Sequence, residues 1–221
     1  MQKTSSPTQA TYDGLNAAYQ FFNAKLFGGT LPHCLITMQR HKGAYGYFSG
    51  DRFASIGDPQ DITDEIALNP AHFASRPPTG TLSTLAHEMV HLWQHHCGKP
   101  SRNGYHNKQW ADRMRGIGLI PSDTGQPGGK DTGQKITHVI EPGGRFEKAC
   151  AAFLAKHTTI LYHDRAGEGE AATRKKKAAS KTKYTCPGCG LGAWAKPDAP
   201  LVCGKCKEPM KADTPDGEAE A

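Results

Sequence analysis

The segment TLAHEMVHLWQHHC, residues 84–97, constrains the fold of this chain more than any other stretch. Its apolar residues recur every three or four positions, which predicts an amphipathic helix from about Leu82 to Cys97. One side of this helix is expected to face the core, and the other carries histidines and one glutamate. The core-facing residues are Leu82, Leu85, Met89, Leu92 and Trp93.

His87, Glu88 and His91 form an HExxH pattern within this helix. Residues four positions apart lie roughly 40° apart around a helix axis and about 6 Å apart along it, so both imidazoles can reach one tetrahedral zinc ion. Glu88 projects from the same side, where it can accept a proton from a metal-bound water without binding the metal. We therefore predict a zinc site with Glu88 as the catalytic base. The competing interpretation is a set of ordinary hydrogen-bonded core histidines.

A catalytic zinc site needs a third protein ligand and an open position. His95 lies roughly 12 Å from His87 along the same axis, too far to bind the same ion. His106 follows the break after the helix and is the leading candidate, because a glycine-containing turn can fold it back beneath the helix. Asp112 is the reserve candidate, and Cys97 would bind only if the helix ended early.

The remaining histidines have no spacing that pairs them with a partner, so ordinary polar roles are expected for them. They are His33, His41, His72, His138, His157 and His163, and His96 is expected to point away from the site. Tyr47 and Tyr105 are candidates for an additional hydrogen-bond donor, with packing as the alternative. The polar segment 121–135 is either a lid over the site or a simple connection.

Helical periodicities and short apolar runs alternate along the first 165 residues, which predicts a mixture of helices and strands. The runs Leu31–Gln39 and Ala44–Phe48 are expected to pair as a hairpin through the sequence RHKG. The other predicted elements are a helix within residues 11–29, a strand around Ile66 to Pro70, a helix from about Asn107 to Arg115, a strand at ITHVI, and a helix from Arg145 to Lys156.

Four cysteines near the C-terminus form two CxxC pairs with 13 residues between them. Four thiolates on two tight turns suit a closed tetrahedral zinc site with a structural role. Disulfides and a redox-active dithiol pair are the alternatives. The four residues are Cys186, Cys189, Cys203 and Cys206, whereas Cys34, Cys97 and Cys150 are expected to be single thiols, which suits a reducing cytoplasm.

The composition changes at about Ala166, which predicts a domain over residues 11–165 and a basic flexible linker over 166–183. A four-cysteine zinc ribbon over 184–212 and an acidic disordered tail over 213–221 complete the chain. Cationic linker residues attract phosphates, and an exposed tryptophan can stack on an unpaired base, so non-specific binding of DNA is predicted, single-stranded DNA included. The residues are Arg174, Lys175, Lys176, Lys177, Lys181, Lys183 and Trp194. The alternative is a solvated linker with Trp194 packed inside the ribbon.

The formal net charge of +6 is too small to identify a partner by itself. No apolar run reaches the ~18 residues expected of a transmembrane helix. The N-terminus lacks the apolar core of a signal peptide, so a cytoplasmic location, in association with the nucleoid if DNA is bound, is expected.

Several motifs together resemble the SprT-like (Spartan-related) family in order and spacing. They are AAYQFFNAKLFGGTLP, IALNP, TLAHEMVHLWQ and GYHNKQWADRMRGIGL, followed by the four-cysteine module. The resemblance implies a small α+β, zincin-like metalloprotease domain. It also implies that His87, His91 and His106 are the ligands of a catalytic zinc ion and that Glu88 is the base. The family's substrates are DNA-bound proteins.

The sequence therefore predicts a zinc-dependent metalloendopeptidase with one catalytic and one structural zinc ion. Its expected substrates are proteins bound or crosslinked to DNA, which places it in DNA repair. The alternative is a non-catalytic, zinc-containing protein that binds nucleic acid or the transcription machinery. Glu88 separates the two, because a scaffold has no need of a base beside the metal. A hydrolase acting on a non-peptide substrate is a third hypothesis.

Overall fold

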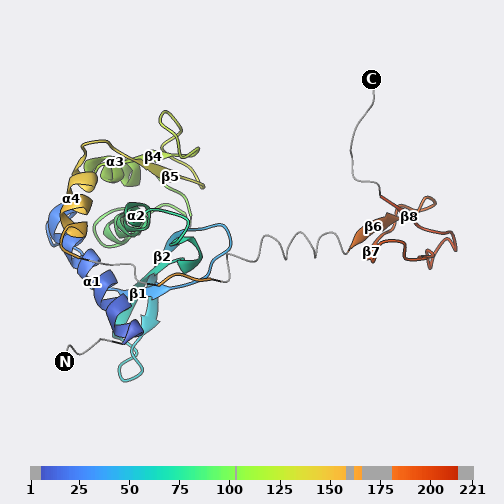
Figure 1. The fold of residues 1–221 in the computed structure, drawn as a ribbon, viewed down its shortest axis with the longest axis horizontal. Helices are drawn as coiled ribbons and strands as arrows, with labels where there is room; N and C mark the ends of the chain where they lie inside the picture. The colour runs from blue at the N-terminus through green and yellow to red at the C-terminus, as the bar shows by residue number, and fades with distance from the viewer. Residues whose placement is uncertain (1–5, 103, 158–161, 166–180, 214–221) are drawn as a thin grey trace. The chain divides into compact units, whose positions relative to one another are not determined.

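The computed structural model describes residues 6–102, 104–157, 162–165 and 181–213. The chain divides into two compact units, residues 1–164 and residues 165–221. The first unit holds both helices and strands, so the mixed α+β class is confirmed (Figure 1). The predicted basic linker lies mostly outside the described residues, as does the tail from residue 214 onward. Among the described residues, no helix has the length and apolar character needed to cross a membrane.

The elements of the first unit alternate between helices and strands along the chain (Figure 1). They are α1 (Pro7–Leu26), β1 (Leu35–Met38), β2 (Gly46–Ala54), β3 (Ile62–Leu68), a short 3-10 helix (Pro70–His72), α2 (Pro78–Cys97), α3 (Lys108–Gly116), β4 (Leu119–Ser122), β5 (Thr137–Ile140) and α4 (Arg145–Leu154). The strand at ITHVI and the helices predicted near residues 11–29, 107–115 and 145–156 are therefore confirmed.

The predicted hairpin between the first two strands is wrong. In the main sheet the strand order is β1-β3-β2, with β1 parallel to β3 and β2 antiparallel to it. Residues 64–68 of β3 are buried, whereas β1 and β2 are only partly covered. The most buried strand thus takes the central position, and β2 is left as an edge strand among the described residues.

The core is formed where α1, α2 and α4 pack together. Leu15, Tyr19, Phe22 and Leu26 of α1 are buried, as their helical spacing predicts. Phe22 meets two aromatic rings of α4 at centroid distances of 5.6 and 5.8 Å. The glycines after α1 have positive φ values, which suit the end of a helix.

Helix α2 begins at Pro78, earlier than the predicted start at Leu82. Proline is well tolerated in the first helical turn, because its missing N–H has no intrahelical partner there. The predicted core-facing residues are buried, with Trp93 only partly covered. Ala86, Val90, His87 and Glu88 are buried as well, so α2 is enclosed on nearly every side.

The second unit contains β6 (Thr182–Thr185), β7 (Gly192–Ala195) and β8 (Lys211–Ala212) in the order β7-β6-β8. Strand β6 begins at Thr182, inside the range predicted as linker. Asp213, the first residue of the predicted tail, is bonded to β6. The Asp213 N–H donates to the Lys183 carbonyl at 2.8 Å, and the Asp213 carboxylate pairs with Lys183 Nζ at 2.8 Å.

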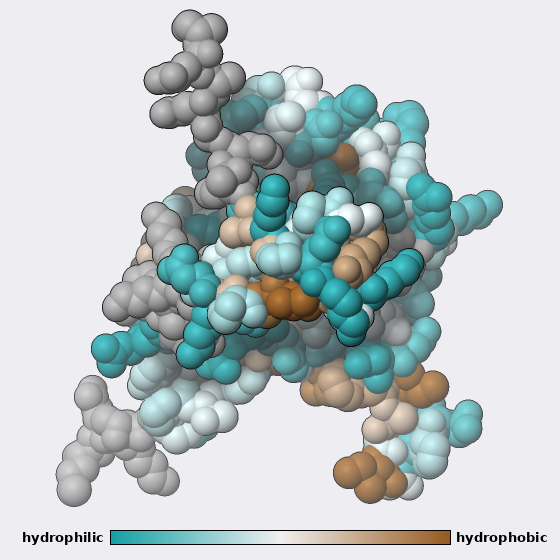
Figure 2. Space-filling view, turned by 90° about the vertical axis from the view of Figure 1, so that its right-hand side faces the viewer, coloured by the Kyte–Doolittle hydropathy of each residue, from teal (hydrophilic) through white to brown (hydrophobic). Residues whose placement is uncertain are grey.

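The face shown in Figure 2 is mostly hydrophilic, with apolar residues in small separate areas.

Candidate metal centre

Three histidines of the first unit converge on one point. One ring nitrogen from each of His87, His91 and His106 lies within 4.8 Å of the others. His91 Nε2 and His106 Nε2 are 3.1 Å apart. The reserve candidates do not join this group, because Asp112 is exposed and pairs with Lys108 at 2.9 Å, and Cys97 is exposed.

Gln94 and Asn107 hold the segment that returns His106 to α2. Gln94 Nε2 donates to Asn107 Oδ1 at 2.7 Å, and the same oxygen accepts from Trp110 N at 3.0 Å, which caps α3. His106 also forms a backbone bridge with Gly133, with hydrogen bonds of 2.8 and 3.0 Å. Gln94 has no predicted role from the sequence, although a polar residue on the last turns of a buried helix is a signal for such a contact.

Trp110 of α3 packs against all three imidazoles. Its ring centroid lies 4.3 Å from that of His106, 4.9 Å from that of His87 and 5.2 Å from that of His91, which it stacks upon. Trp110 is fully buried. The indole therefore fixes the rings from one side and keeps water away from that side of the site.

A backbone carbonyl fixes the tautomer of His106. His106 Nδ1 lies 3.1 Å from the carbonyl oxygen of Gly133, and a carbonyl can only accept a hydrogen bond. The proton of a neutral His106 is therefore on Nδ1, which leaves a lone pair on Nε2, the nitrogen that faces His91. Metal-binding histidines commonly donate their other ring N–H to a carbonyl in this way.

A hydrogen-bond chain through His138 of β5 fixes the tautomer of His87. Ser83 Oγ donates to the Gly80 carbonyl at 2.9 Å, so it accepts from His138 Nε2, which is also 2.9 Å away. His138 Nδ1 then carries a lone pair and accepts from His87 Nδ1 at 3.1 Å. The lone pair of His87 is consequently on Nε2, free to bind a metal ion.

His138 makes ordinary hydrogen bonds, but one of its partners, His87, belongs to the group of three converging histidines. His138 lies 51 positions from His87 along the chain and reaches it through the pairing of β5 with β4. The spacing between His87 and His138 matches no metal-binding pattern, so the sequence alone held no signal for this contact. His138 is a candidate for a positioning role, because it contacts His87 and is not itself one of the three converging histidines.

Burial sets the charge of these side chains. Desolvation lowers the pKa of His91 to about 3 and that of His138 to about 4, and it holds the pKa of His87 well below its ordinary value. The pKa of His106 is lowered for the same reason. Neutral imidazole is the form that binds metal ions. The lowered pKa values therefore keep these histidines in the form that can bind a cation.

Glu88 lies in the same cleft as the three histidines. Burial raises the pKa of its carboxyl to about 8, since no cation among the described residues compensates its charge. A bound divalent cation would favour the charged form and lower that pKa again. Glu88 and the histidines line a cleft of about 1020 Å³. Strand β2 lines it from Gly46 to Gly50, and Tyr47 and Tyr105 also reach it.

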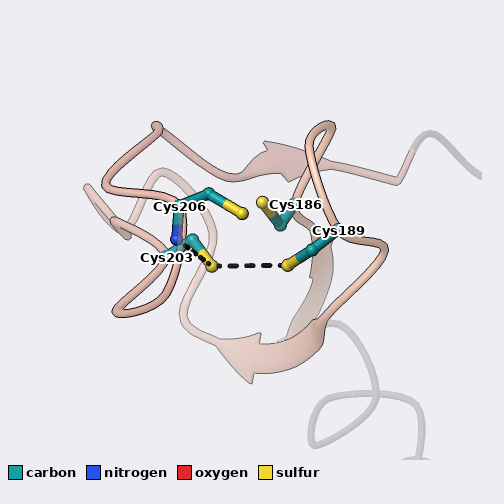
Figure 3. Close-up of side chains that lie close together, drawn as sticks. All are labelled: Cys186, Cys189, Cys203 and Cys206. Atoms are coloured by element: carbon teal, nitrogen blue, oxygen red, sulfur yellow. Dashed lines mark hydrogen bonds between the residues drawn. The ribbon is translucent and has the colours of Figure 1, made fainter.

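The four cysteines of the second unit form a separate group. Figure 3 shows their sulfur atoms pointing toward one another from two turns. All four sulfurs lie within 4.8 Å of one another, and Cys189 Sγ and Cys203 Sγ are 3.6 Å apart, far longer than a disulfide bond of ~2.05 Å. Backbone N–H groups of Cys206 and Lys205 lower the pKa of the Cys203 thiol to about 7. This donor set is compatible with zinc.

A model of the SprT-like family matches residues 15–128, slightly more than half of the chain. The chain belongs to the SprT-like family. The match contains His87, Glu88, His91 and His106 of this SprT-like protein, and it ends before His138 and the four cysteines. The family resemblance seen in the sequence is thus confirmed, while the roles of the individual residues stay predictions.

One curated protein is similar to part of this SprT-like chain. It is an "Uncharacterized protein in mucB 3'region" from Salmonella typhimurium, 62% identical over 61 residues. The similar stretch covers 27% of this chain and 80% of that protein. No solved structure matches the chain.

Replacing His138 by phenylalanine tests the positioning role in this SprT-like protein. The change removes the acceptor for His87 Nδ1, and we expect zinc to bind about 10- to 100-fold more weakly at the three histidines. Competition with a chromophoric chelator, after the four-cysteine group is loaded, measures the affinity. His33→Phe is the control, because His33 lies outside the group and is not buried. Equal affinities of His138→Phe and the unmodified chain would contradict the role.

Proposed function

We propose that this SprT-like protein is a zinc-dependent metalloendopeptidase with a zincin-like first unit. The observation that carries the proposal is the buried carboxyl of Glu88 beside three convergent imidazoles in one cleft. A purely structural metal site is closed by four protein ligands, whereas three ligands leave a position for water or substrate. A neighbouring base is useful only at such an open position.

The donor set fits a zinc ion. Three imidazoles with one ring nitrogen each within 4.8 Å of the others match the ligand preference of zinc, and His106 and His87 each have their other ring nitrogen held by a hydrogen bond. A zinc ion bound there would supply Lewis-acid polarisation of a carbonyl and lower the pKa of a bound water.

The chain's own residues would supply the proton transfers. We assign Glu88 as the general base. Its carboxylate takes a proton from the attacking water and then donates that proton to the nitrogen of the leaving amine. The burial of Glu88 favours this second step, because a carboxyl in an apolar setting holds a proton more readily than one in water. Tyr47 and Tyr105, which line the cleft, are candidates for a hydrogen bond to the developing oxyanion.

The shape of the cleft favours an extended peptide as substrate. Strand β2 forms one wall from Gly46 to Gly50, and its only partner strand among the described residues is β3. The free edge of β2 therefore offers backbone N–H and carbonyl groups that a substrate strand can pair with. A non-peptide substrate would leave these groups unused.

The second unit supports DNA-bound proteins as the substrate class. Trp194 is 68% exposed, so the alternative that it packs inside the unit is wrong. Lys183 is its cross-strand neighbour in the β6–β7 pair, which places a cation and an aromatic ring on one face. Such a face suits unpaired bases and phosphates. Lys183 also pairs with Asp213, so part of its charge is already compensated; residues 174–177 lie outside the described residues.

The test is cleavage of a DNA-binding protein by the zinc-loaded chain, with and without single-stranded DNA. We expect cleavage that stops when a chelator removes zinc and that single-stranded DNA accelerates. The Trp194→Ala variant should bind single-stranded DNA roughly 5- to 150-fold more weakly, the equivalent of ~1–3 kcal/mol for one lost stacking contact.

The Trp194→Ala variant is expected to keep its DNA-independent cleavage, because Trp194 is in the second unit. Tyr12→Ala is the matched control, since Tyr12 is an exposed aromatic residue on α1. No cleavage by the fully zinc-loaded chain under any condition would favour the non-catalytic binding protein. Cleavage at the same rate with and without single-stranded DNA would contradict DNA-bound proteins as the substrate class, while the assignment as a peptidase would stand.

A further inference from the structure

A second cluster of metal-binding side chains lies at the C-terminal end of α2. His95 and His96 occupy the last turn of this helix, and Asp64 belongs to β3. One ligand atom from each of the three lies within 4.8 Å of the others. The cluster shares no residue with the three-histidine group. From the sequence, His95 is too distant for the HExxH ion and His96 is expected to point away, so neither residue has a predicted partner.

The distances within the cluster are close to those around a bound ion. His95 Nε2 lies 3.2 Å from Asp51 Oδ2 and 3.8 Å from Asp64 Oδ1, and His96 Nε2 lies 2.6 Å from Asp64 Oδ2. Ligand atoms on a tetrahedral zinc ion are roughly 3.3 Å apart when each bond is ~2.0–2.1 Å. To admit an ion, the His96–Asp64 contact must lengthen, and Asp51, which contacts His95 but is outside the group of three, must move closer to the other ligand atoms. The side chains of His96 and Asp51 are 37% and 67% exposed.

The backbone of β2 is shaped to bring Asp51 next to His95 of the cluster. The pairing of β2 with β3 is irregular between Ser49 and Phe53, and Asp51 has a φ of 52°, in the left-handed region that most residues avoid. A β-bulge of this kind redirects a side chain, and here it turns the Asp51 carboxylate toward His95. The Asp51 N–H also donates to Asp64 Oδ1 at 2.8 Å, which fixes the second carboxylate.

Gly50 makes room for the ring of His95. A Cβ atom at this position would lie 2.7 Å from His95 Cε1 and 2.9 Å from His95 Nε2, closer than atoms tolerate. The absence of a side chain lets the imidazole lie against the β2 backbone with Nε2 turned toward the carboxylates. Asp64 is buried, with only 4% of its side chain exposed, so it is held in place for a fixed partner.

We propose that Asp51, Asp64, His95 and His96 bind a divalent first-row transition-metal ion, for which Zn²⁺ is the test ion. Two imidazoles with two carboxylates are a donor set that suits Zn²⁺ rather than Ca²⁺ or Mg²⁺, which prefer oxygen ligands alone. The partial negative charge at the C-terminus of a helix also favours a cation at this end of α2. The ion joins the bulge of β2 to α2 at the edge of the cleft, which Gly50 and His95 line.

The competing explanation is a pair of histidine–aspartate ion pairs that need no metal. The two explanations differ in the number of zinc ions that the chain binds. The full chain, stripped of metal and then dialysed against excess zinc, is analysed for zinc by inductively coupled plasma mass spectrometry. We expect the unmodified chain to bind one equivalent more than the His95→Ala/His96→Ala chain.

The comparison is independent of the catalytic proposal, because both chains keep His87, His91, His106 and the four cysteines. His33→Ala is the control for a histidine outside the metal-binding groups and should bind as much zinc as the unmodified chain. Asp51→Asn removes the charge of an exposed carboxylate without changing the packing of the core. This variant should lower the affinity for the additional ion at least tenfold. Circular dichroism confirms that each variant is folded. Equal zinc content in the unmodified and His95→Ala/His96→Ala chains would overturn the proposal, as would loss of the additional ion in His33→Ala.

Discussion

Replacing Glu88 by glutamine is expected to lower the rate of peptide cleavage by about 10²- to 10⁴-fold, the usual contribution of a positioned general base. Glutamine keeps the size of the side chain but cannot take the proton of the attacking water. Glu88 is not in the group of three converging histidines, so the variant should retain its zinc. Single-turnover cleavage measures the rate, and the zinc content of the same sample shows that the site is filled.

The Glu147→Gln variant is a matched control for this change. Glu147 is an exposed glutamate in the first turn of α4 and does not line the cleft. It is expected to cleave at the rate of the unmodified chain. A Glu88→Gln chain that holds its zinc and keeps cleaving near the normal rate would show that another group accepts the proton, and the assignment of Glu88 would fall.

The parts of the site that the sequence predicted are local ones. His87, Glu88 and His91 are on one helix, and helical periodicity places them on one side without knowledge of the rest of the fold. His106 could be predicted as a ligand because it follows α2 after a short break. The prediction required the chain to fold back toward α2 after that break, and the hydrogen bond between Gln94 and Asn107 holds the chain in this path.

The parts that the sequence did not predict depend on contacts between distant elements. The hairpin between β1 and β2 was expected because the two runs are adjacent in sequence, yet β3, the most buried of the three strands, lies between them and pairs with both. His138 reaches His87 only after β5 has paired with β4. Asp51 and Asp64 meet His95 only because the bulge in β2 and the register of β3 bring them to the end of α2. Each of these contacts depends on which strands pair, and the pairing joins residues that are distant in the sequence.

Replacing Cys203 by serine is expected to remove one equivalent of zinc and to unfold the second unit while leaving the first unit folded. Among the described residues of the second unit, the buried apolar side chains are only Tyr184, Cys186 and Cys203. So small a core cannot offset the loss of ~1–2 kcal/mol of backbone entropy for each residue that becomes ordered. Zinc binding to such four-ligand modules contributes ~10–16 kcal/mol, which makes the fold dependent on the metal.

Limited proteolysis measures this effect, because an unfolded second unit is cut within residues 182–213 whereas the first unit resists. Cys97→Ser is the control, since Cys97 is an exposed thiol outside the four-cysteine group. It should keep both the zinc and the protease resistance of the second unit. A Cys203→Ser chain that resists proteolysis as the unmodified chain does would mean that the second unit folds without its metal. The exposed Trp194 would then be held in place by strand pairing alone, and a chelator would leave DNA binding unchanged.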